Sequence, residues 1–214
     1  MSKERVKVYF DGFNMYHALH ALRENHLKWV NLHKLSKRLL RPRTQTLDGV
    51  VYCSALANHF TGTKDHNKLA RHIAYRNALE AKGVDCRMGK FAKRDLFFTR
   101  HNYRAKWKRR EEKQTDVRIA ISLVEDAYEN EFDTALIVSC DSDLVPSFEA
   151  VKRRFPEKRL VTVAPPGRKH NDELLALADY HLSVKTKQVR ECLFGARIMR
   201  NKSIVAVRPP EYRP

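Results

Sequence analysis

The sequence contains no hydrophobic run that approaches the roughly 20 residues of a membrane-spanning helix. Its opening residues, MSKERVKVYF, are charged before they become strand-like, and they lack the apolar segment and cleavage site of a secretory signal peptide. The four cysteines are scattered without a C-x-x-C pair, so neither a disulfide framework nor a zinc site is expected. From these absences we expect a cytoplasmic protein that does not bind membranes.

Acidic residues are in the minority. The 214 residues include 25 Asp and Glu against 42 Lys and Arg, a formal net charge of +17. Such an excess attracts polyanions, and nucleic acid is the first candidate partner; the alternative is a basic surface that serves solubility alone. Hydrophobic residues make up 43% of the chain, so it can bury a core and its composition is not that of a disordered protein.

Apolar runs alternate with helical patterns along the chain. The predicted strands are 5–12, 50–56, 84–92, 134–140 and 159–166, and the predicted helices are 13–25, 31–40, 64–82, 116–130, 142–155 and 171–184, the last giving way to a short strand. Because the strands are continuous apolar runs, they favour a mainly parallel sheet with helices on both faces, a three-layer α/β sandwich. Without internal repeats or linkers, we expect one domain over 1–185 and a C-terminal extension, 186–214, that is partly mobile.

Two of the predicted helices have an expected inward face. We expect Phe13, Tyr16 and Leu19 to face the core from the first helix. The helix over 116–130 is strongly amphipathic, and its expected inward positions are Val117, Ile119 or Ala120, Ile121, Val124 and Ala127.

Carboxylates follow the predicted strands at the points where those strands end. Asp11 follows the first strand, Asp141 and Asp143 follow the apolar run TALIV, and Asp116 opens the amphipathic helix. Since active sites of open α/β sheets form beyond the carboxyl ends of the strands, the four acids can meet in one cleft. A divalent cation such as Mg²⁺ or Mn²⁺ would then neutralise them. Taken singly, each acid also has a structural explanation as a turn residue, a helix-dipole charge or an N-cap.

Three segments in order resemble the NYN domain family, the LabA-like branch of the PIN-like nuclease superfamily: VYFDGFNMYHAL (8–19), EEKQTDVRIAISLVEDA (111–127) and DTALIVSCDSDLVPSFEAVKRR (133–154). The family pattern is D-x-x-N after a strand, K-x-x-D at a helix start and S-G-D-S-D-F after a later strand. The chain departs from it in three places: Cys140 stands at a usual glycine, Leu144 at a usual phenylalanine, and QT (114–115) at a usual glycine–hydrophobic pair.

The resemblance implies a PIN-like fold and a metal-dependent nuclease, usually an endoribonuclease, that uses Mg²⁺ or Mn²⁺. The residues that match its acidic metal site are Asp11, Asp116, Asp141 and Asp143. Asn14 matches the asparagine of the first motif and would complete the catalytic set by bonding a carboxylate or a phosphate. Lys113 matches the lysine before the helix acid and could contact a phosphate, although a solvated lysine is the alternative.

A basic segment leads into the second motif. Residues 93–112 have no clean period, and we interpret them as an extended arm or loop. Within them, cations that can track phosphates alternate with aromatic rings that can stack on unpaired bases. The residues expected to contact nucleic acid are Lys113, Arg100, Tyr103, Arg104, Trp107, Lys108, Arg109 and Arg110. The alternative is a solvated charge run.

The leading hypothesis is therefore a metal-dependent ribonuclease that hydrolyses single-stranded or structured RNA. A non-catalytic RNA-binding or protein-binding module remains open, as does a DNA nuclease or a phosphatase that shares the metal chemistry. The sequence leaves a homo-oligomer or a protein partner undetermined.

Overall fold

The computed structural model describes residues 2–55, 67–100 and 103–214, with the backbone alone in 90–100 and 103–113. In these ranges seven strands form one sheet in the order β4-β3-β2-β1-β5-β6-β7. The strands are β1 (Glu4–Asp11), β2 (Gln45–Ala55), β3 (Asp85–Arg100), β4 (Tyr103–Lys113), β5 (Thr134–Val138), β6 (Arg159–Ala164) and β7 (Tyr180–Ser183). All neighbours pair in parallel except β3 and β4, which are antiparallel. The mainly parallel sheet is confirmed.

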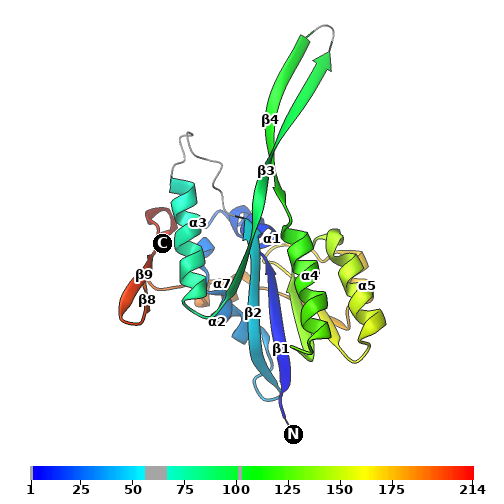
Figure 1. Cartoon of the computed structure of the whole chain (residues 1–214). Coiled ribbons are helices and arrows are strands. Elements are labelled where there is room, and N and C mark those ends of the chain that lie inside the picture. The colour runs from blue at the N-terminus through cyan, green and yellow to red at the C-terminus, as the bar shows by residue number, and fades with distance from the viewer. Residues whose placement is uncertain (1, 56–66, 101–102) are drawn as a thin grey trace.

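Helices cover both faces of this sheet, which confirms the three-layer sandwich (Figure 1). The helices are α1 (Gly12–Ala21), α2 (Leu32–Leu39), α3 (Asn67–Glu80), α4 (Thr115–Tyr128), α5 (Val145–Arg154), α6 (Asp172–Leu177) and α7 (Thr186–Glu191), with 3-10 turns η1 (Asn25–Trp29), η3 (Ser142–Leu144) and η4 (Pro210–Tyr212). Successive strand residues point to opposite faces. Val8 and Phe10 therefore pack with α1 to α3, whereas Tyr9 packs with α4 to α6. None of the helices in the described ranges combines the length and apolar composition that a bilayer crossing needs.

Residues after 185 pack onto the α1–α3 side of the molecule. They form α7, a hairpin of β8 (Arg197–Arg200) and β9 (Ser203–Val207), and η4. Tyr212 is only 8% exposed and its ring centroid lies 6.5 Å from that of Trp29. The C-terminal residues thus share the core of the main body, and their division from it at residue 185, like their mobility, stays a prediction.

Two expected inward faces differ from the structure. Phe13 is 39% exposed, so its inward placement was wrong, whereas Leu19 is buried as expected. On α4 the buried stripe contains Ile119, Leu123 and Ala127, spaced four residues apart. Ile119 and Ala127 are therefore inward as expected, whereas Val117 and Ile121 lie on the other side of the helix and are at least half exposed, so their inward placement was wrong.

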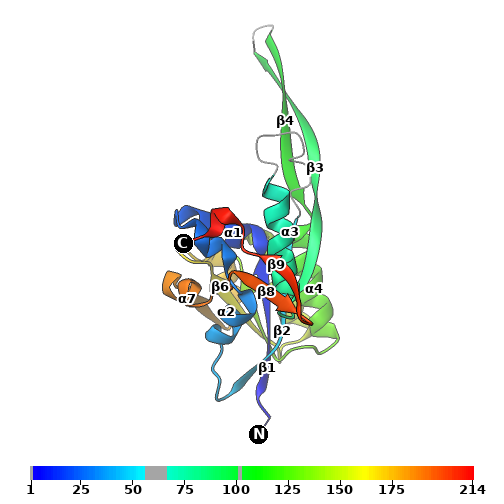
Figure 2. The same ribbon diagram turned by 90° about the vertical axis from the view of Figure 1, so that its left-hand side faces the viewer.

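The basic segment, described over 93–100 and 103–112, belongs to a long β-hairpin, so of the two predicted forms it is an extended arm rather than a loop. β3 pairs with β2 only over residues 85–89, and beyond that it pairs with β4 from Lys90↔Lys113 to Arg100↔Tyr103. The hairpin projects past the helices (Figures 1 and 2). A ribbon that extends away from the body has no core to face, so its sequence lacks the alternation that identifies a half-buried strand.

Candidate metal and nucleic-acid site

Three of the predicted acids meet at the carboxyl edge of the sheet. Asp11 is the last residue of β1, Asp141 lies just after β5, and Asp116 is in the first turn of α4. β1 and β5 are parallel neighbours with Phe10 opposite Val138, so their carboxyl ends lie together. Each of the three side chains offers an oxygen, and these oxygens lie within 4.8 Å of one another.

Asp11 is almost completely buried and fully hydrogen-bonded. Its Oδ1 accepts from the backbone amides of Phe13 (3.0 Å) and Asn14 (2.9 Å), which makes Asp11 the N-cap of α1. Its Oδ2 accepts from Asn14 Nδ2 (2.6 Å) and Ser139 Oγ (2.8 Å). These four donors occupy about all the lone-pair positions of one carboxylate. Burial raises the pKa of Asp11, and the hydrogen bonds from Asn14 and Ser139 oppose that shift.

Asn14 and Ser139 join the two motifs physically. Besides donating to Asp11, Asn14 accepts a hydrogen bond of 3.4 Å from the backbone amide of Cys140. Ser139 is fully buried. Its hydroxyl accepts a hydrogen bond of 3.1 Å from the amide of Asp141 and donates one to Asp11. The loop after β5 is therefore fixed against the start of α1, and this fixes where Asp141 lies relative to Asp11.

The start of α1 also requires a close approach to β2. A Cβ added at Gly12 would lie 2.7 Å from the carbonyl oxygen of Cys53 and 2.7 Å from Cβ of Ser54. Since backbone at that distance cannot move aside cheaply, only glycine lets α1 begin directly at the end of β1. The glycine thus sets the position of Asn14 two residues later.

Asp116 shows the electrostatic consequence of the cluster. Partial burial, followed by the negative charges of Asp11, Asp141 and Asp143, raises the pKa of Asp116 to about 6. Like charges held together favour protonation of one of them, and a bound cation would relieve the same repulsion. The charge of Asp143 adds to this repulsion, but Asp143 is exposed and lies outside the group of three. Its amide donates a hydrogen bond of 3.0 Å to Oδ1 of Asp141.

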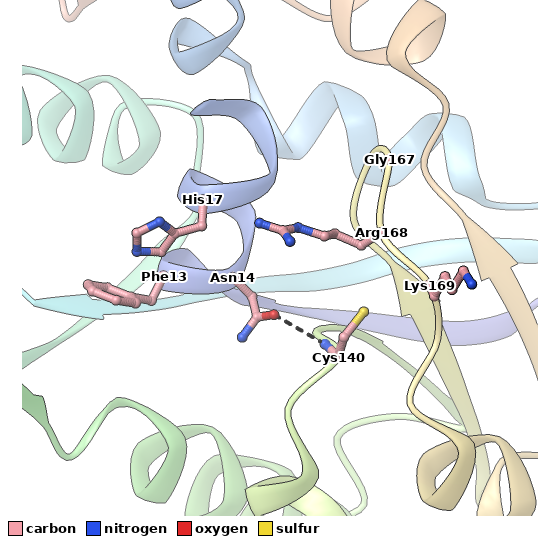
Figure 3. Close-up of a pocket in the computed structure, with 7 residues that line it drawn as sticks. All are labelled: Phe13, Asn14, His17, Cys140, Gly167, Arg168 and Lys169. Atoms are coloured by element: carbon pink, nitrogen blue, oxygen red, sulfur yellow. Dashed lines mark hydrogen bonds between the residues drawn. The ribbon is translucent and has the colours of Figure 1, made fainter. Parts of the chain in front are cut away.

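A pocket of about 550 Å³ adjoins the acids. Its lining residues are Phe13, Asn14 and His17 of α1, Cys140 after β5, and Gly167, Arg168 and Lys169 after β6 (Figure 3). The pocket therefore shares Asn14 and Cys140 with the surroundings of the cluster.

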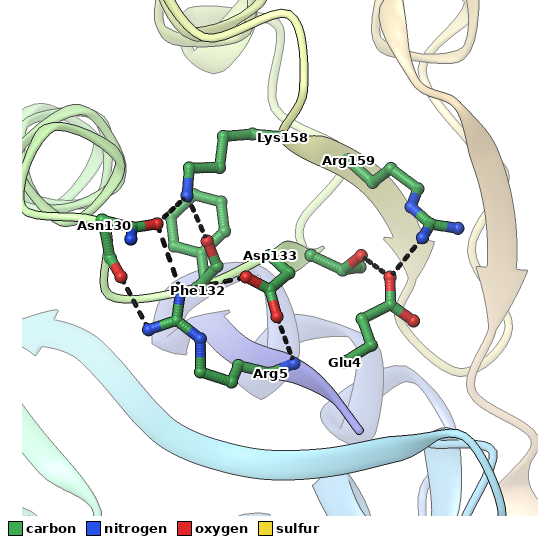
Figure 4. A network of polar contacts seen from close by, with 8 residues as sticks. Glu4, Arg5, Asn130, Phe132, Asp133, Lys158 and Arg159 are labelled. Carbon is green, nitrogen blue, oxygen red and sulfur yellow. Dashed lines mark hydrogen bonds and ion pairs between the residues drawn. The ribbon is translucent and has the colours of Figure 1, made fainter. Parts of the chain in front are cut away.

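The opposite edge of the sheet carries acids too, and there cations neutralise them (Figure 4). Arg5 pairs with Asp133 at 2.9 Å, and Arg159 pairs with Glu4 at 3.1 Å. Within the described residues no Lys, Arg or His forms an ion pair with Asp11, Asp116 or Asp141. Among the described residues, the carboxylates at the carboxyl edge thus converge without the ion pairs seen at the opposite edge.

The geometry of the three acids fits a hard divalent cation. Mg²⁺ binds oxygen at about 2.1 Å, so two ligands on opposite sides of one ion are about 4.2 Å apart. Small side-chain rotations bring oxygens that lie within 4.8 Å of one another to such distances. The ligand set is entirely carboxylate, which suits Mg²⁺ or Mn²⁺ better than a thiolate-seeking metal.

The residues predicted to contact nucleic acid lie on the hairpin. Arg100 is the last residue of β3, and the others belong to β4: Tyr103, Arg104, Trp107, Lys108, Arg109, Arg110 and Lys113. β4 ends at Lys113 and α4 begins at Thr115, so a single residue, Gln114, separates the hairpin from the helix of Asp116.

A family model, that of the NYN domain, matches residues 5–185. This chain belongs to the NYN domain family. The match starts in β1 and ends after β7, so the NYN domain of this protein includes the whole seven-stranded sheet and all three clustered acids.

Solved structures similar to this NYN domain add evidence about the fold. VPA0982 of Vibrio parahaemolyticus, described as a protein of unknown function, aligns with a TM-score of 0.52 and 19% identity over 86% of this chain and 94% of that one. MurG of Acinetobacter baumannii aligns with a TM-score of 0.40 and 8% identity over 97% of this chain and 46% of that one, which carries no argument. No curated protein matches the chain.

Several residues beside the acids were not predicted from the sequence. Ser139 was part of the recognised motif without a role, and its contacts with Asp11 and Asp141 give it one. Arg168 and Lys169 follow β6 within PPGRK, and the rule that sites form beyond strand ends, applied to this third strand, could have found them. Phe13 and His17 were missed because an aromatic residue in a helix is usually taken as core.

Proposed function

We propose that this NYN domain is a metal-dependent ribonuclease that hydrolyses phosphodiester bonds of single-stranded or structured RNA. One observation carries the proposal: Asp11, Asp116 and Asp141 converge at the carboxyl edge of an otherwise basic protein, and none of them forms an ion pair with a cationic side chain in the part of the chain that the structure describes. Clustered carboxylates repel phosphate, so a protein that only bound RNA would gain nothing from them. Nucleases are typical of the family.

The three acids would contribute differently to holding Mg²⁺ or Mn²⁺. Asp116 and Asp141 are half-buried and would bind the cation directly. Asp11 would act through a bound water or after releasing a donor such as Asn14, because its oxygens already accept four hydrogen bonds. When bound, the cation would polarise a phosphoryl oxygen of the substrate and lower the pKa of a water molecule.

The other residues around the cluster would position the reacting groups. Asn14 and Ser139 hold Asp11 and the Asp141 loop at a fixed separation, so little reorganisation is needed when substrate binds. Asp143 is exposed at the rim and is available to accept the proton of the attacking water. In-line attack on phosphorus would break the bond to the 3′-oxygen and leave a 5′-phosphate and a 3′-hydroxyl.

The hairpin is the proposed contact for RNA. Its basic residues would neutralise phosphates, and Tyr103 and Trp107 would stack on unpaired bases. Support comes from the connection of β4 through Gln114 to α4, which would lead a strand bound on the hairpin toward Asp116.

The test is cleavage of end-labelled single-stranded RNA, and of DNA of the same sequence, with Mg²⁺, Mn²⁺ or EDTA. Wild type is compared with Asp141→Asn and with a matched control, Asp48→Asn, which removes an exposed carboxylate from β2. We expect metal-dependent cutting of RNA that only Asp141→Asn abolishes. Undiminished cutting by Asp141→Asn would refute the site, preferential cutting of DNA would refute the substrate, and tight binding without cutting would favour a binding module.

A further inference from the structure

The pocket beside the acids is joined to the site by shared residues. Asn14 lines the pocket and also donates 2.6 Å to Asp11. Cys140 lines it too and immediately precedes Asp141. A group held in the pocket would therefore lie directly next to a phosphate held at the acids.

A turn at the end of β6 brings Arg168 to this pocket. The amide of Arg168 donates a hydrogen bond of 3.1 Å to the carbonyl of Pro165, and Pro166 and Gly167 lie between these two residues. Gly167 has φ +72°, so the segment has the features of a type II turn, which favours proline at its second position and glycine at its third. The sequence PPGR thus predisposes the chain to this turn.

The Arg168 guanidinium has no partner among the described residues. It is exposed, and no hydrogen bond or ion pair joins it to a described carboxylate, although the acidic cluster is nearby. In Figure 3 it extends toward α1, whereas the amine of Lys169 points away from the pocket. Arg168 and His17 line the same pocket, and burial, followed by the charge of Arg168, lowers the pKa of His17. A planar guanidinium without a carboxylate suits a phosphate.

Aromatic surface lies across the pocket from this cation. The rings of Phe13 and His17, one helical turn apart on α1, have centroids 4.7 Å apart in an edge-on arrangement. Phe13 is 39% exposed, although burial would be favourable for a side chain of this size. The pocket therefore suits both parts of a nucleotide. The exposed aromatic ring can stack on the base, and the guanidinium can pair with the phosphate.

We propose that this pocket is a nucleotide subsite, which holds the nucleotide of the substrate strand that flanks the scissile phosphate. Arg168 pairs with its phosphate, and Phe13 and His17 contact its base. The volume of about 550 Å³ lies within the usual range for pockets that hold small ligands. This inference rests on the proposed function, since it assigns part of the same substrate to a neighbouring surface.

The first test measures binding without cleavage. Fluorescein-labelled single-stranded RNA is titrated with the full chain in EDTA, and anisotropy gives the Kd of wild type, Arg168→Gln and the matched control Arg200→Gln, which changes an exposed arginine of β8 outside the pocket. We expect Arg168→Gln to raise the Kd about tenfold, because one charge-assisted hydrogen bond is removed, and Arg200→Gln to raise it less than about threefold. Equal effects of the two variants would overturn the subsite. Both residues are exposed, so circular dichroism should show unchanged folds.

A second set of measurements separates the base contact and the source of the ligand. Phe13→Leu should weaken RNA binding about fivefold because a leucine cannot stack on a base, and a nucleoside monophosphate should displace RNA better than inorganic phosphate does. No effect of Phe13→Leu, or equal displacement by phosphate, would overturn the base contact. A mononucleotide that binds as tightly as RNA would overturn the assignment to a substrate strand.

Failure of this inference differs visibly from failure of the nuclease. Binding differences in EDTA with no cleavage in any metal would support the subsite and refute the nuclease. Metal-dependent cleavage with identical affinities of wild type and Arg168→Gln would support the nuclease and refute the subsite. If both hold, Arg168→Gln should raise KM with little change in kcat, the pattern of an interaction equal in the ground and transition states.

Discussion

Ser139 donates a hydrogen bond of 2.8 Å from its hydroxyl to Oδ2 of Asp11, which lies 128 residues earlier in the chain. The same hydroxyl oxygen accepts 3.1 Å from the amide of Asp141. One fully buried hydroxyl thus connects the ends of β1 and β5 and the two acids that they carry. Its position explains why a serine begins the motif after β5.

Ser139→Ala should therefore weaken the site more than the fold. We expect the free energy of unfolding to fall by about 1–2 kcal/mol, because Asp11 keeps three donors and its fourth is removed. Affinity for Mn²⁺, measured by calorimetry, should fall as well. The matched control is Ser36→Ala. It removes an equally buried hydroxyl, which donates a hydrogen bond of 2.8 Å to the carbonyl of Leu32 within α2. Equal Mn²⁺ affinity in the two variants would contradict the role of Ser139.

The pKa of Asp116 predicts how stability depends on pH without metal. Its folded pKa of about 6 exceeds the ordinary value of 3.8, so between these values the folded chain binds more protons than the unfolded chain. The contribution of Asp116 to stability is therefore complete below the unfolded pKa and is lost as pH rises through the folded one. In EDTA, the Tm of wild type relative to Asp116→Asn should fall between about pH 4 and about pH 7.

A bound cation should reverse this loss. Mn²⁺ should raise the Tm of wild type more at about pH 7.5 than at about pH 5, since protons compete with the metal for Asp116 at the lower pH. Asp116→Asn should show a smaller shift at both values. Equal Mn²⁺ shifts for the two proteins would show that the cation binds elsewhere.

Gln114 joins the hairpin to α4 with φ +80°, a left-handed conformation that costs a residue with a side chain about 1–2 kcal/mol. The family usually has glycine there. Gln114→Gly should consequently stabilise the protein by about 1 kcal/mol in urea unfolding, after allowance for the greater entropy of the unfolded glycine chain. Gln114→Ala, which keeps a Cβ, should give no gain. A similar gain from alanine would show that the side chain, not φ, is responsible.

The hairpin prediction concerns salt dependence. Changing Arg104, Lys108 and Arg109 to glutamine together should weaken RNA binding and reduce the slope of log K against log salt by about 2, roughly 0.7 for each phosphate that is no longer neutralised. The control changes three exposed arginines outside the β3–β4 hairpin to glutamine: Arg153, Arg154 and Arg200. An unchanged slope in the hairpin variant, or the same change in both, would place the RNA elsewhere.

The sequence was most informative where a signal is local. Apart from the β3–β4 hairpin, strands and helices lie near the apolar runs that predicted them. Asn31, the first residue of the helix predicted over 31–40, is the N-cap of α2, and its side chain accepts a hydrogen bond of 3.0 Å from the amide of Lys34. Signals that depend on a partner were less informative. By spacing, Val117 and Ile121 were as good candidates for the inward face of α4 as Ile119, but α4 packs on the sheet through Ile119 and Leu123.

The sequence by itself determined the family, the alternation of strands and helices, and the acids at strand ends, because motif spacing and hydrophobic period are properties of neighbouring residues. Only the tertiary structure decided which groups meet. The strand order brings β1 beside β5, so Asp11 lies near Asp141 while Asp143 stays at the rim. It also brings the turn after β6 to α1, where Arg168 faces Phe13 and His17. Strand order is set by packing across the whole sheet, and no local stretch of sequence specifies it.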